Sequence, residues 1–443
     1  MTKKGKYMVN TRELILEILL EVIEKGSYSH LVIRSVLDKY QYLEKQERAF
    51  ITRVAEGTIQ TMIELDYIIN QYSKVKVNKM KPVIRNILRM SVYQIKYMDS
   101  VPDSAACNEA VKLARKKGFS SLSGFVNGVL RNISRNPAVL LPNKERNPVQ
   151  HYSVKYSTPE WLVELWNSDY GVAMMEQILG DFMKEAPITI RTNLAKITPE
   201  ELAKKLENEG VTVKKIELKD IPSLDYAFMI SGFDYLNALP SFKEGLFYVQ
   251  DVSSMMVAEL AAPKKGDYII DVCAAPGGKS IHLAEKLQKT GVVEARDLTE
   301  YKVGLIEENI TRHGCTNMKA VQMDATILDE ASVGMADIVI ADLPCSGLGV
   351  MRKKTDIKYK MTPEKMTSLV ELQRNMLHTV CNYVKEGGIL IYSTCTIHRG
   401  ENEGNISWFI KEHPEFALQS QQQIFPQEEF GDGFFIAKLK KIG

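Results

Sequence analysis

The feature that most constrains the fold is a regular alternation of apolar runs and helical patterns in the second half of the chain. Five short apolar runs, each suited to a buried strand, occupy residues 268–272, 292–295, 319–323, 337–341 and 389–392. Parallel strands need long crossover connections, and these are usually helices. The alternation therefore predicts an α/β fold with a doubly wound, Rossmann-like parallel sheet. Such sheets bind their ligands beyond the carboxyl ends of the strands.

Two further regions precede this sheet. The chain has 443 residues, which is longer than a chain that folds around a single hydrophobic core usually is. Two or three domains are therefore expected. Helical periodicity runs through the first part, with one long pattern from residue 45 to 72. A stretch of linker composition follows, and strand and helix patterns then alternate as in small ferredoxin-like or RNA-recognition units. We expect an all-helical domain at 1–140, a small α/β subdomain at 151–245 and the sheet domain at 246–443.

Charge is distributed unevenly along the chain. The net charge is only +2, but residues 1–137 hold about 23 Lys and Arg against about 13 Asp and Glu, roughly +10. Seven cations without an intervening acid follow one another there: Lys74, Lys76, Lys79, Lys81, Arg85, Arg89 and Lys96. This asymmetry favours an N-terminal domain that meets a polyanion such as RNA. The alternative is an ordinary solvated helix face.

Several classes of protein are excluded by composition. The six cysteines are too few for a disulfide scaffold and form no C-x-x-C pair, so we expect no metal site. No stretch approaches the ~20 apolar residues that a membrane span needs. The basic start of the chain is followed by an amphipathic pattern, where a signal peptide would have an unbroken apolar core. The sequence therefore predicts a cytoplasmic protein without membrane contact.

A glycine-rich turn follows the first predicted strand of the sheet, in the stretch Asp271-Val-Cys-Ala-Ala-Pro-Gly-Gly-Lys279. Such a strand–turn–helix connection lets a ligand approach the backbone and the helix N-terminus. Asp297 ends the second strand, where a carboxylate can bind two ribose hydroxyls, and Asp324 ends the third, where it can receive an adenine amino group. The turn lacks G-x-G-x-x-G, which disfavours a nicotinamide or flavin dinucleotide. Together these residues predict a site for another nucleoside cofactor.

Two cysteines follow the fourth and fifth predicted strands, in Asp342-Leu-Pro-Cys345 and Ser-Thr-Cys395. One interpretation is a pair of inert core thiols. Their position beyond adjacent strand ends, where functional groups gather, favours a reactive pair instead. A thiolate that adds to C6 of cytosine makes C5 nucleophilic enough to accept a methyl group from a sulfonium, and Asp342 is placed to bind the N3/N4 edge of the base. The chemistry alone does not choose between the two thiols.

These motifs resemble those of the RNA cytosine-5 methyltransferases. The resemblance rests on Cys-Ala-Ala-Pro-Gly-Gly-Lys (273–279), Asp-Leu-Pro-Cys-Ser-Gly (342–347), Asp-Ile-Lys (356–358), Tyr-Ser-Thr-Cys-Thr with Glu-Asn-Glu (392–396, 401–403) and the terminal Asp-Gly-Phe-Phe-Ile-Ala (432–437). The basic helical region looks like the antiterminator-type, NusB-like RNA-binding domain of one branch. That branch is the bacterial small-subunit ribosomal RNA methyltransferase B (RsmB/Sun/Fmu) group, so the resemblance covers nearly the whole chain.

The resemblance implies a role for each matching residue. Cys395 would be the nucleophile, Cys345 would assist release of the product, and Asp342 with Lys279 would line the base pocket. S-adenosyl-L-methionine is the implied cofactor. Its implied contacts are Cys273, Ala274, Ala275, Pro276, Gly277, Gly278, Lys279, Asp297, Asp324 and Asp342. The implied partner is small-subunit (16S) ribosomal RNA, modified by a monomer.

Three positions depart from the family pattern, and three other functions compete with this one. Leu343 replaces the usual Ala and is expected to narrow the pocket slightly, whereas Thr355 and Gly431 are expected to be loop variation. A methyltransferase acting on base amino groups would carry an aromatic residue where this chain has Cys345. The remaining alternatives are a cytosine-5 methyltransferase of another RNA, such as tRNA, and a non-catalytic RNA-binding or antitermination protein.

Overall fold

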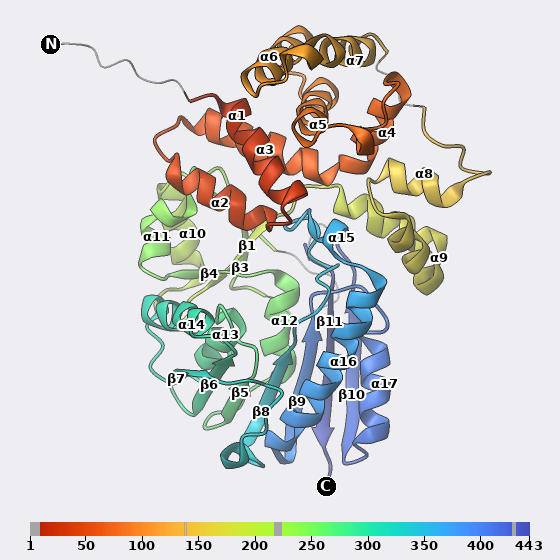
Figure 1. Ribbon diagram of the computed structural model, residues 1–443. Helices are drawn as coiled ribbons and strands as arrows, with labels where there is room; N and C mark the ends of the chain where they lie inside the picture. The colour runs from red at the N-terminus through yellow and green to blue at the C-terminus, as the bar shows by residue number, and fades with distance from the viewer. Residues whose placement is uncertain (1–8, 137, 139, 217–223, 428–430) are drawn as a thin grey trace, which may run out of the picture. The chain divides into compact units, whose positions relative to one another are not determined.

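The computed structural model describes residues 9–136, 138, 140–216, 224–427 and 431–443 (Figure 1). It divides the chain into two compact units. The first, the helical unit, contains residues 1–183 together with the short segment 353–360. The second, the sheet unit, contains residues 184–352 and 361–443. Among the described helices, none is long and apolar enough to cross a membrane.

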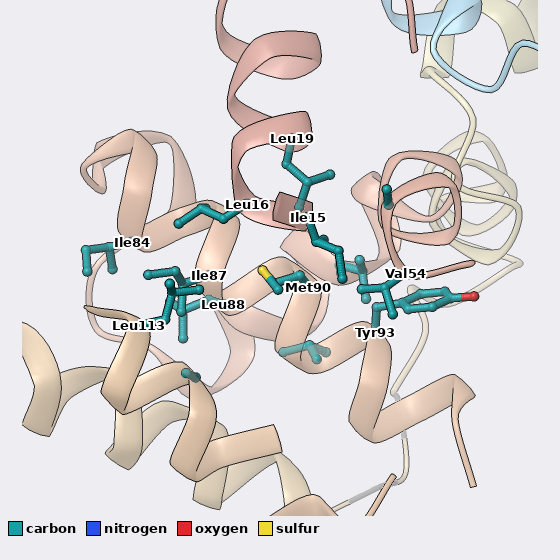
Figure 2. Packing of buried hydrophobic residues seen from close by; sticks show 14 of the residues in the cluster. Ile15, Leu16, Leu19, Val54, Ile84, Ile87, Leu88, Met90, Tyr93 and Leu113 are labelled. Atoms are coloured by element: carbon teal, nitrogen blue, oxygen red, sulfur yellow. The ribbon is translucent and has the colours of Figure 1, made fainter. Parts of the chain in front are cut away.

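The helical unit confirms the all-helical prediction for the first part of the chain. Its main helices are α1 (Thr11–Leu19), α2 (Ser29–Lys39), α3 (Lys45–Gln60), α4 (Met62–Tyr72), α5 (Pro82–Tyr97), α6 (Asp103–Lys116), α7 (Ser123–Arg135), α8 (Pro148–Lys155) and α9 (Glu160–Phe182). Helix α5 lies at the centre of the core, and its Ile87, Leu88 and Met90 pack with Leu16 and Val54 (Figure 2). The core is built mainly from such aliphatic side chains, whose burial supplies the driving force for folding.

The long helical pattern between residues 45 and 72 forms two helices instead of one. Helix α3 ends at Gln60 and α4 begins at Met62, because Thr61 leaves the helical conformation (φ −101°, ψ 17°). Its hydroxyl donates to the carbonyl of Gly57 at 2.7 Å, a local bond that competes with helix continuation. A Cβ on Gly57 would lie 2.1 Å from the ring of Tyr93, so only glycine allows α3 and α5 to approach this closely.

The segment 353–360 belongs to the helical unit by its contacts, although it follows the Cys345 loop in sequence. Buried Asp356 accepts hydrogen bonds from the backbone N–H and the hydroxyl of Ser29 (3.2 and 2.5 Å). Buried Lys358 donates to the carbonyl of Gln60 at 2.8 Å. The Asp-Ile-Lys motif thus packs among the N-terminal helices, outside the sheet domain expected at 246–443.

A four-stranded antiparallel sheet opens the sheet unit, as the expected small α/β subdomain requires. Its strands are β1 (Ile188–Thr192), β2 (Thr212–Lys215), β3 (Ala227–Ser231) and β4 (Phe247–Val249), in the order β2-β3-β1-β4. Helices α10 (Pro199–Asn208) and α11 (Pro240–Lys243) lie between them in the chain. The expected range 151–245 differs at both ends from this arrangement. Residues 151–183 form helices that group with the helical unit, and β4 begins only after residue 245.

The second sheet has seven strands in the order β10-β11-β9-β8-β5-β6-β7 (Figure 1). These are β5 (Tyr268–Asp271), β6 (Val292–Asp297), β7 (Met318–Gln322), β8 (Ala336–Asp342), β9 (Val384–Thr394), β10 (Phe416–Ile424) and β11 (Phe434–Lys441). The five predicted strands are present and pair in parallel. The last two were not predicted. Strand β11 pairs antiparallel with β9, so the sheet is mixed rather than purely parallel.

Helices cover both faces of the seven-stranded sheet. Consecutive strand residues point to opposite cores, since Ile270 and Val339 join one hydrophobic cluster and Ile269 and Ile338 the other. The first cluster is completed by α16 (Pro363–Val380) and α17 (Glu403–Glu412), and the second by α12 (Val252–Ala261) and α13 (Gly278–Lys286). A further helix, α14 (Glu300–His313), follows β6. This double covering is why the strands read as unbroken apolar runs.

Candidate active site

The glycine-rich turn joins the carboxyl end of β5 to the start of α13. Gly277 has φ +103°, a conformation that favours glycine, and α13 begins at Gly278. A Cβ on Gly278 would lie 2.8 Å from the ring of Tyr248, so this turn packs tightly against β4. The side chains of Tyr248 and Asn309 both donate to the carbonyl of Pro276, at 3.3 and 2.9 Å. The backbone of the turn is therefore fixed from outside.

Asp297 and Asp324 lie at the ends of the two neighbouring strands. One carboxylate oxygen of buried Asp297 accepts from the backbone N–H of Ala275 in the turn, at 3.0 Å. Its other oxygen accepts from the backbone N–H of Leu298 and pairs with Lys302 at 2.9 Å. Asp324 accepts from both the backbone and the hydroxyl of Thr326 through Oδ1, and the hydroxyl bond is the main cause of its lowered pKa. Both carboxylates therefore lie at the same edge of the sheet as the glycine-rich turn.

The two cysteines are in direct contact. Strands β8 and β9 are parallel neighbours in which Asp342 is paired with Ser393, so the loops that follow them start side by side. The sulfur atoms of Cys345 and Cys395 are 3.3 Å apart. The hydrogen bond with Cys395, followed by burial, raises the pKa of Cys345 well above its usual range. The side chain of Cys345 is therefore a neutral thiol at neutral pH.

An ion pair stands beside the thiols. Asp342 accepts from the Nζ of Lys279 at 2.6 Å through one oxygen and from the hydroxyl of Ser393 at 2.8 Å through the other. Burial alone would lower the pKa of Lys279, but the nearby carboxylate of Asp342 outweighs it, so the pKa is raised and the ammonium is kept. The structure thus brings Lys279, Asp342 and both cysteines together at one edge of the sheet.

The side chain of the neighbouring residue Leu343 lies in the core of the sheet unit. It is 3% exposed and packs in the hydrophobic cluster that α16 and α17 complete. Its backbone N–H donates to the carbonyl of Ser393 at 3.2 Å. The replacement of Ala by Leu is therefore accommodated by the core.

The structure also reveals a contact between glycines that the sequence did not predict. Gly349 donates its N–H to the carbonyl of Cys395 at 3.0 Å and accepts from the N–H of Gly433 at 2.8 Å. A Cβ on Gly349 would lie 1.9 Å from the carbonyl oxygen of Gly433, so three backbone segments meet without side chains between them. The glycines themselves were visible in the sequence, but their contact depends on the unpredicted position of β11.

The run of seven cations divides into two groups within the helical unit. Three are used internally, since Arg85 pairs with Glu24, Arg89 with Asp66 and Lys96 with Glu64. The other four lie exposed on the connection between α4 and α5: Lys74, Lys76, Lys79 and Lys81. We call these four the lysine loop. About half of the run is therefore available to a polyanion.

Three family models match successive parts of the chain. Residues 9–135 match the NusB family, residues 158–221 match the ferredoxin-like domain of RsmF/B-like methyltransferases, and residues 258–440 match the 16S rRNA methyltransferase RsmB/F family.

Two relatives and one solved structure match nearly the whole chain, and a second solved structure matches part of it. The probable ribosomal RNA small subunit methyltransferase B of Bacillus subtilis (strain 168) is 36% identical over 98% of this chain and 99% of its own. Its counterpart from Synechocystis is 32% identical over 98% and 100%. The crystal structure of PH0851 has a TM-score of 0.81 at 26% identity and covers 98% of this chain and 99% of that one. The structure of NSun6 from Pyrococcus horikoshii with SFG has a TM-score of 0.58 at 25% identity and covers 64% and 98%. With its NusB-like, ferredoxin-like and methyltransferase parts in this order, the chain belongs to the ribosomal RNA small subunit methyltransferase B family of RNA cytosine-5 methyltransferases.

Proposed function

We propose that the site transfers a methyl group from S-adenosyl-L-methionine to C5 of one cytosine in small-subunit (16S) ribosomal RNA through a covalent adduct. The observation that carries this proposal is the pair of sulfur atoms 3.3 Å apart beside the Lys279–Asp342 ion pair. Methylation of a base amino group needs no thiol, whereas C5 of cytosine needs a nucleophile at C6. The names of the relatives support small-subunit ribosomal RNA as the substrate.

The residues at the ends of β5, β6 and β7 fit the proposed cofactor. The turn at Gly277 joins the end of β5 to the start of α13, which offers a nucleoside a helix N-terminus at the edge of the sheet. The carboxylates of Asp297 and Asp324 suit ribose hydroxyls and an amino group, respectively. We assign cofactor contacts to Cys273, Ala274, Ala275, Pro276, Gly277, Gly278, Lys279, Asp297, Asp324 and Asp342. S-adenosylmethionine supplies an electrophilic methyl group on a sulfonium sulfur.

We propose that Cys395 starts the reaction. The ammonium of Lys279 lies close enough to Cys395 for their charges to interact, and this favours the thiolate of Cys395. The thiolate forms a bond with C6, and the ring electrons move to C5, which takes the methyl group. Asp342, held by Lys279, accepts from the N4 amino group at the N3/N4 edge of the base, and the ammonium of Lys279 offsets the negative charge that develops on the ring as the adduct forms.

We propose that Cys345 helps to end the reaction. Loss of the C5 proton to a base restores the aromatic ring and breaks the bond between C6 and the sulfur of Cys395. The thiol of Cys345 lies close enough to protonate or assist the departing sulfur. The two cysteines then have successive tasks.

Methylation of purified RNA tests the substrate. We expect the protein to methylate one cytosine of small-subunit ribosomal RNA taken from cells that lack this gene, with transfer followed by labelled methyl groups and the position read by bisulfite sequencing. Transfer RNA serves as the competing substrate. Faster methylation of tRNA would support the other-RNA alternative, and RNA binding without any transfer would support the non-catalytic one.

Two substitutions test the order of the cysteines. Cys395→Ser should lower methylation by about 10³-fold or more, because the nucleophile is removed. Cys345→Ala should leave the enzyme attached to its RNA, visible as a shifted band on a denaturing gel. Full activity of Cys395→Ser would contradict the nucleophile assignment. A Cys345→Ala protein that turns over normally without a shifted band would contradict the release assignment.

A further inference from the structure

A buried carboxylate that the mechanism does not use lies behind the two thiols. Glu401 is 0% exposed, and a buried charge of this kind needs several partners. One oxygen accepts from the hydroxyl of Ser346 (2.5 Å) and contacts Nδ1 of His398 (3.2 Å). The other accepts from the backbone N–H of Ser346 and from the amide of Gln373, both at 2.9 Å. The carboxylate is therefore the centre of a buried polar network.

This network joins the two cysteine loops. Ser346 follows Cys345 directly, and Thr396 follows Cys395. The hydroxyls of Ser346 and Thr396 are 2.6 Å apart, and both residues are fully buried. A chain of hydrogen bonds therefore links Glu401, Ser346 and Thr396. It joins the two loops at the residues that directly follow the two cysteines.

The two loops depend on Glu401 to different degrees. The Cys395 loop has other supports, since Gly349 donates to the carbonyl of Cys395 and Asn402 bonds both Thr394 and Thr396. The Cys345 loop relies on the network more directly. Glu401 accepts twice from Ser346, and Gln373, which it also binds, donates to the carbonyl of Pro344 at 2.8 Å. Loss of the carboxylate should therefore loosen Cys345 and leave Cys395 in place.

We infer that Glu401 is a positioning residue that holds Cys345 against Cys395 and so controls release of the methylated RNA rather than formation of the adduct. The inference rests on the proposed two-cysteine mechanism. Glu401 is buried and cannot touch the substrate, yet it should affect one step, the release of the RNA. A residue with only a structural role would affect adduct formation and release alike.

Glu401→Gln tests the inference with little change in shape. The amide puts N–H groups where the network already supplies donors, so at least one bond to Ser346 or Gln373 is lost. Loss of the partner of a buried polar group typically costs about 10–100-fold in the equilibrium that the bond supports. We expect turnover to fall by about that factor, the RNA-linked band to increase by at least about tenfold, and methylation in the first turnover to stay within about threefold of wild type.

A second measurement follows the thiols without RNA. Phenylarsine oxide bonds two adjacent thiols, and its oxygen leaves as water with the two thiol protons. We expect Glu401→Gln to bind this reagent at least about tenfold more weakly than wild type, because Cys345 is no longer held at contact distance. Ser346→Ala removes only the hydroxyl link and should shift both measurements in the same direction by a smaller amount, which keeps a test available if Glu401→Gln does not fold.

Glu294→Gln is the matched control. Glu294 is buried on β6 of the same unit and pairs with Arg296 and Lys319, away from the cysteine loops. It should leave the RNA-linked band and arsenical binding unchanged.

The inference would be overturned if both Glu401→Gln and Ser346→Ala released the RNA normally. It would also be overturned if these variants lost adduct formation and turnover equally. If Cys345→Ala forms no adduct that depends on Cys395, the proposed function fails as well, so the two failures are distinguishable.

Discussion

Among single residues, Asp271 gives the clearest dependence on pH. It is 0% exposed at the end of β5 and accepts from the hydroxyl of Ser280. Burial raises the pKa of its carboxyl from 3.8 to about 7. The folded state therefore favours the protonated form, and the stability that it gives is complete below the ordinary pKa and is lost as the pH rises through about 7.

Asp271→Asn should remove this dependence, because the amide does not ionise. The thermal midpoint of the variant, relative to wild type, should rise between about pH 4 and 7. Each pH unit is worth at most about 1.4 kcal/mol, or about 3–6 °C in a unit of this size. Circular dichroism melts at pH 5, 6, 7 and 8 measure the difference. A difference that stays constant across this range would show that Asp271 is ionised throughout.

The individual residues also show what sequence patterns can and cannot locate. Cys345 and Cys395 were placed together because both follow strand ends at one edge of a sheet, and the structure gives a contact of 3.3 Å. Glu401 was visible only as part of a motif. Its role depends on Ser346 and Gln373, which lie 55 and 28 residues away, and no local pattern encodes such a meeting.

At the scale of elements, the predicted strands are those that two layers of helices cover. Strands β5 and β8 are apolar on both faces and so form continuous runs. Strand β10 does not give an apolar run, because its middle residues 419–422 are exposed and polar. Strand β11 is buried, but it is paired antiparallel with β9 and follows no crossover helix, so the alternation that located the others does not reach it.

The short helix α15 (Ile357–Lys360) provides a prediction about an element within the helical unit. Lys358 is 4% exposed, and burial lowers the pKa of its amine to about 7. The folded state therefore favours the neutral amine, and the stability that this gives is complete above the ordinary pKa of 10.5. It is lost as the pH falls toward 7.

Lys358→Met removes this titration and keeps an unbranched apolar stem in the core. Gln60 loses one donor to its carbonyl but keeps the hydroxyl of Tyr359 at 3.3 Å. We expect the melting temperature of the variant, relative to wild type, to be highest near pH 7 and to decrease toward pH 10. Melts of the full chain followed at 222 nm check this. A difference that does not change with pH would mean that the buried amine keeps its charge.

At the scale of the whole molecule, positive charge is concentrated in one unit. The sequence predicted this asymmetry, and the structure divides the basic run into internal ion pairs and the exposed lysine loop. Sequence alone could not make that division, because Glu24 and Asp66, which neutralise Arg85 and Arg89, lie on other helices. The lysine loop is therefore the part of the run that can replace counterions on RNA.

Changing Lys74, Lys76, Lys79 and Lys81 to Gln should weaken RNA binding most at low salt. Each lost phosphate contact lowers the slope of log affinity against log salt by about 0.7 for single strands and about 0.9 for duplexes. The slope should therefore fall by up to about 3–4. Affinity for S-adenosylmethionine should stay the same, because the residues proposed to bind it lie in the other unit. Titrations of small-subunit ribosomal RNA at several KCl concentrations measure the slope.

The control for net charge is a second quadruple variant, in which four exposed lysines of the sheet unit are changed to Gln: Lys204, Lys264, Lys265 and Lys289. Equal slopes in the two quadruple variants would mean that the effect comes from net charge. A slope that does not change in the lysine-loop variant would mean that the loop is an ordinary solvated surface that does not contact RNA.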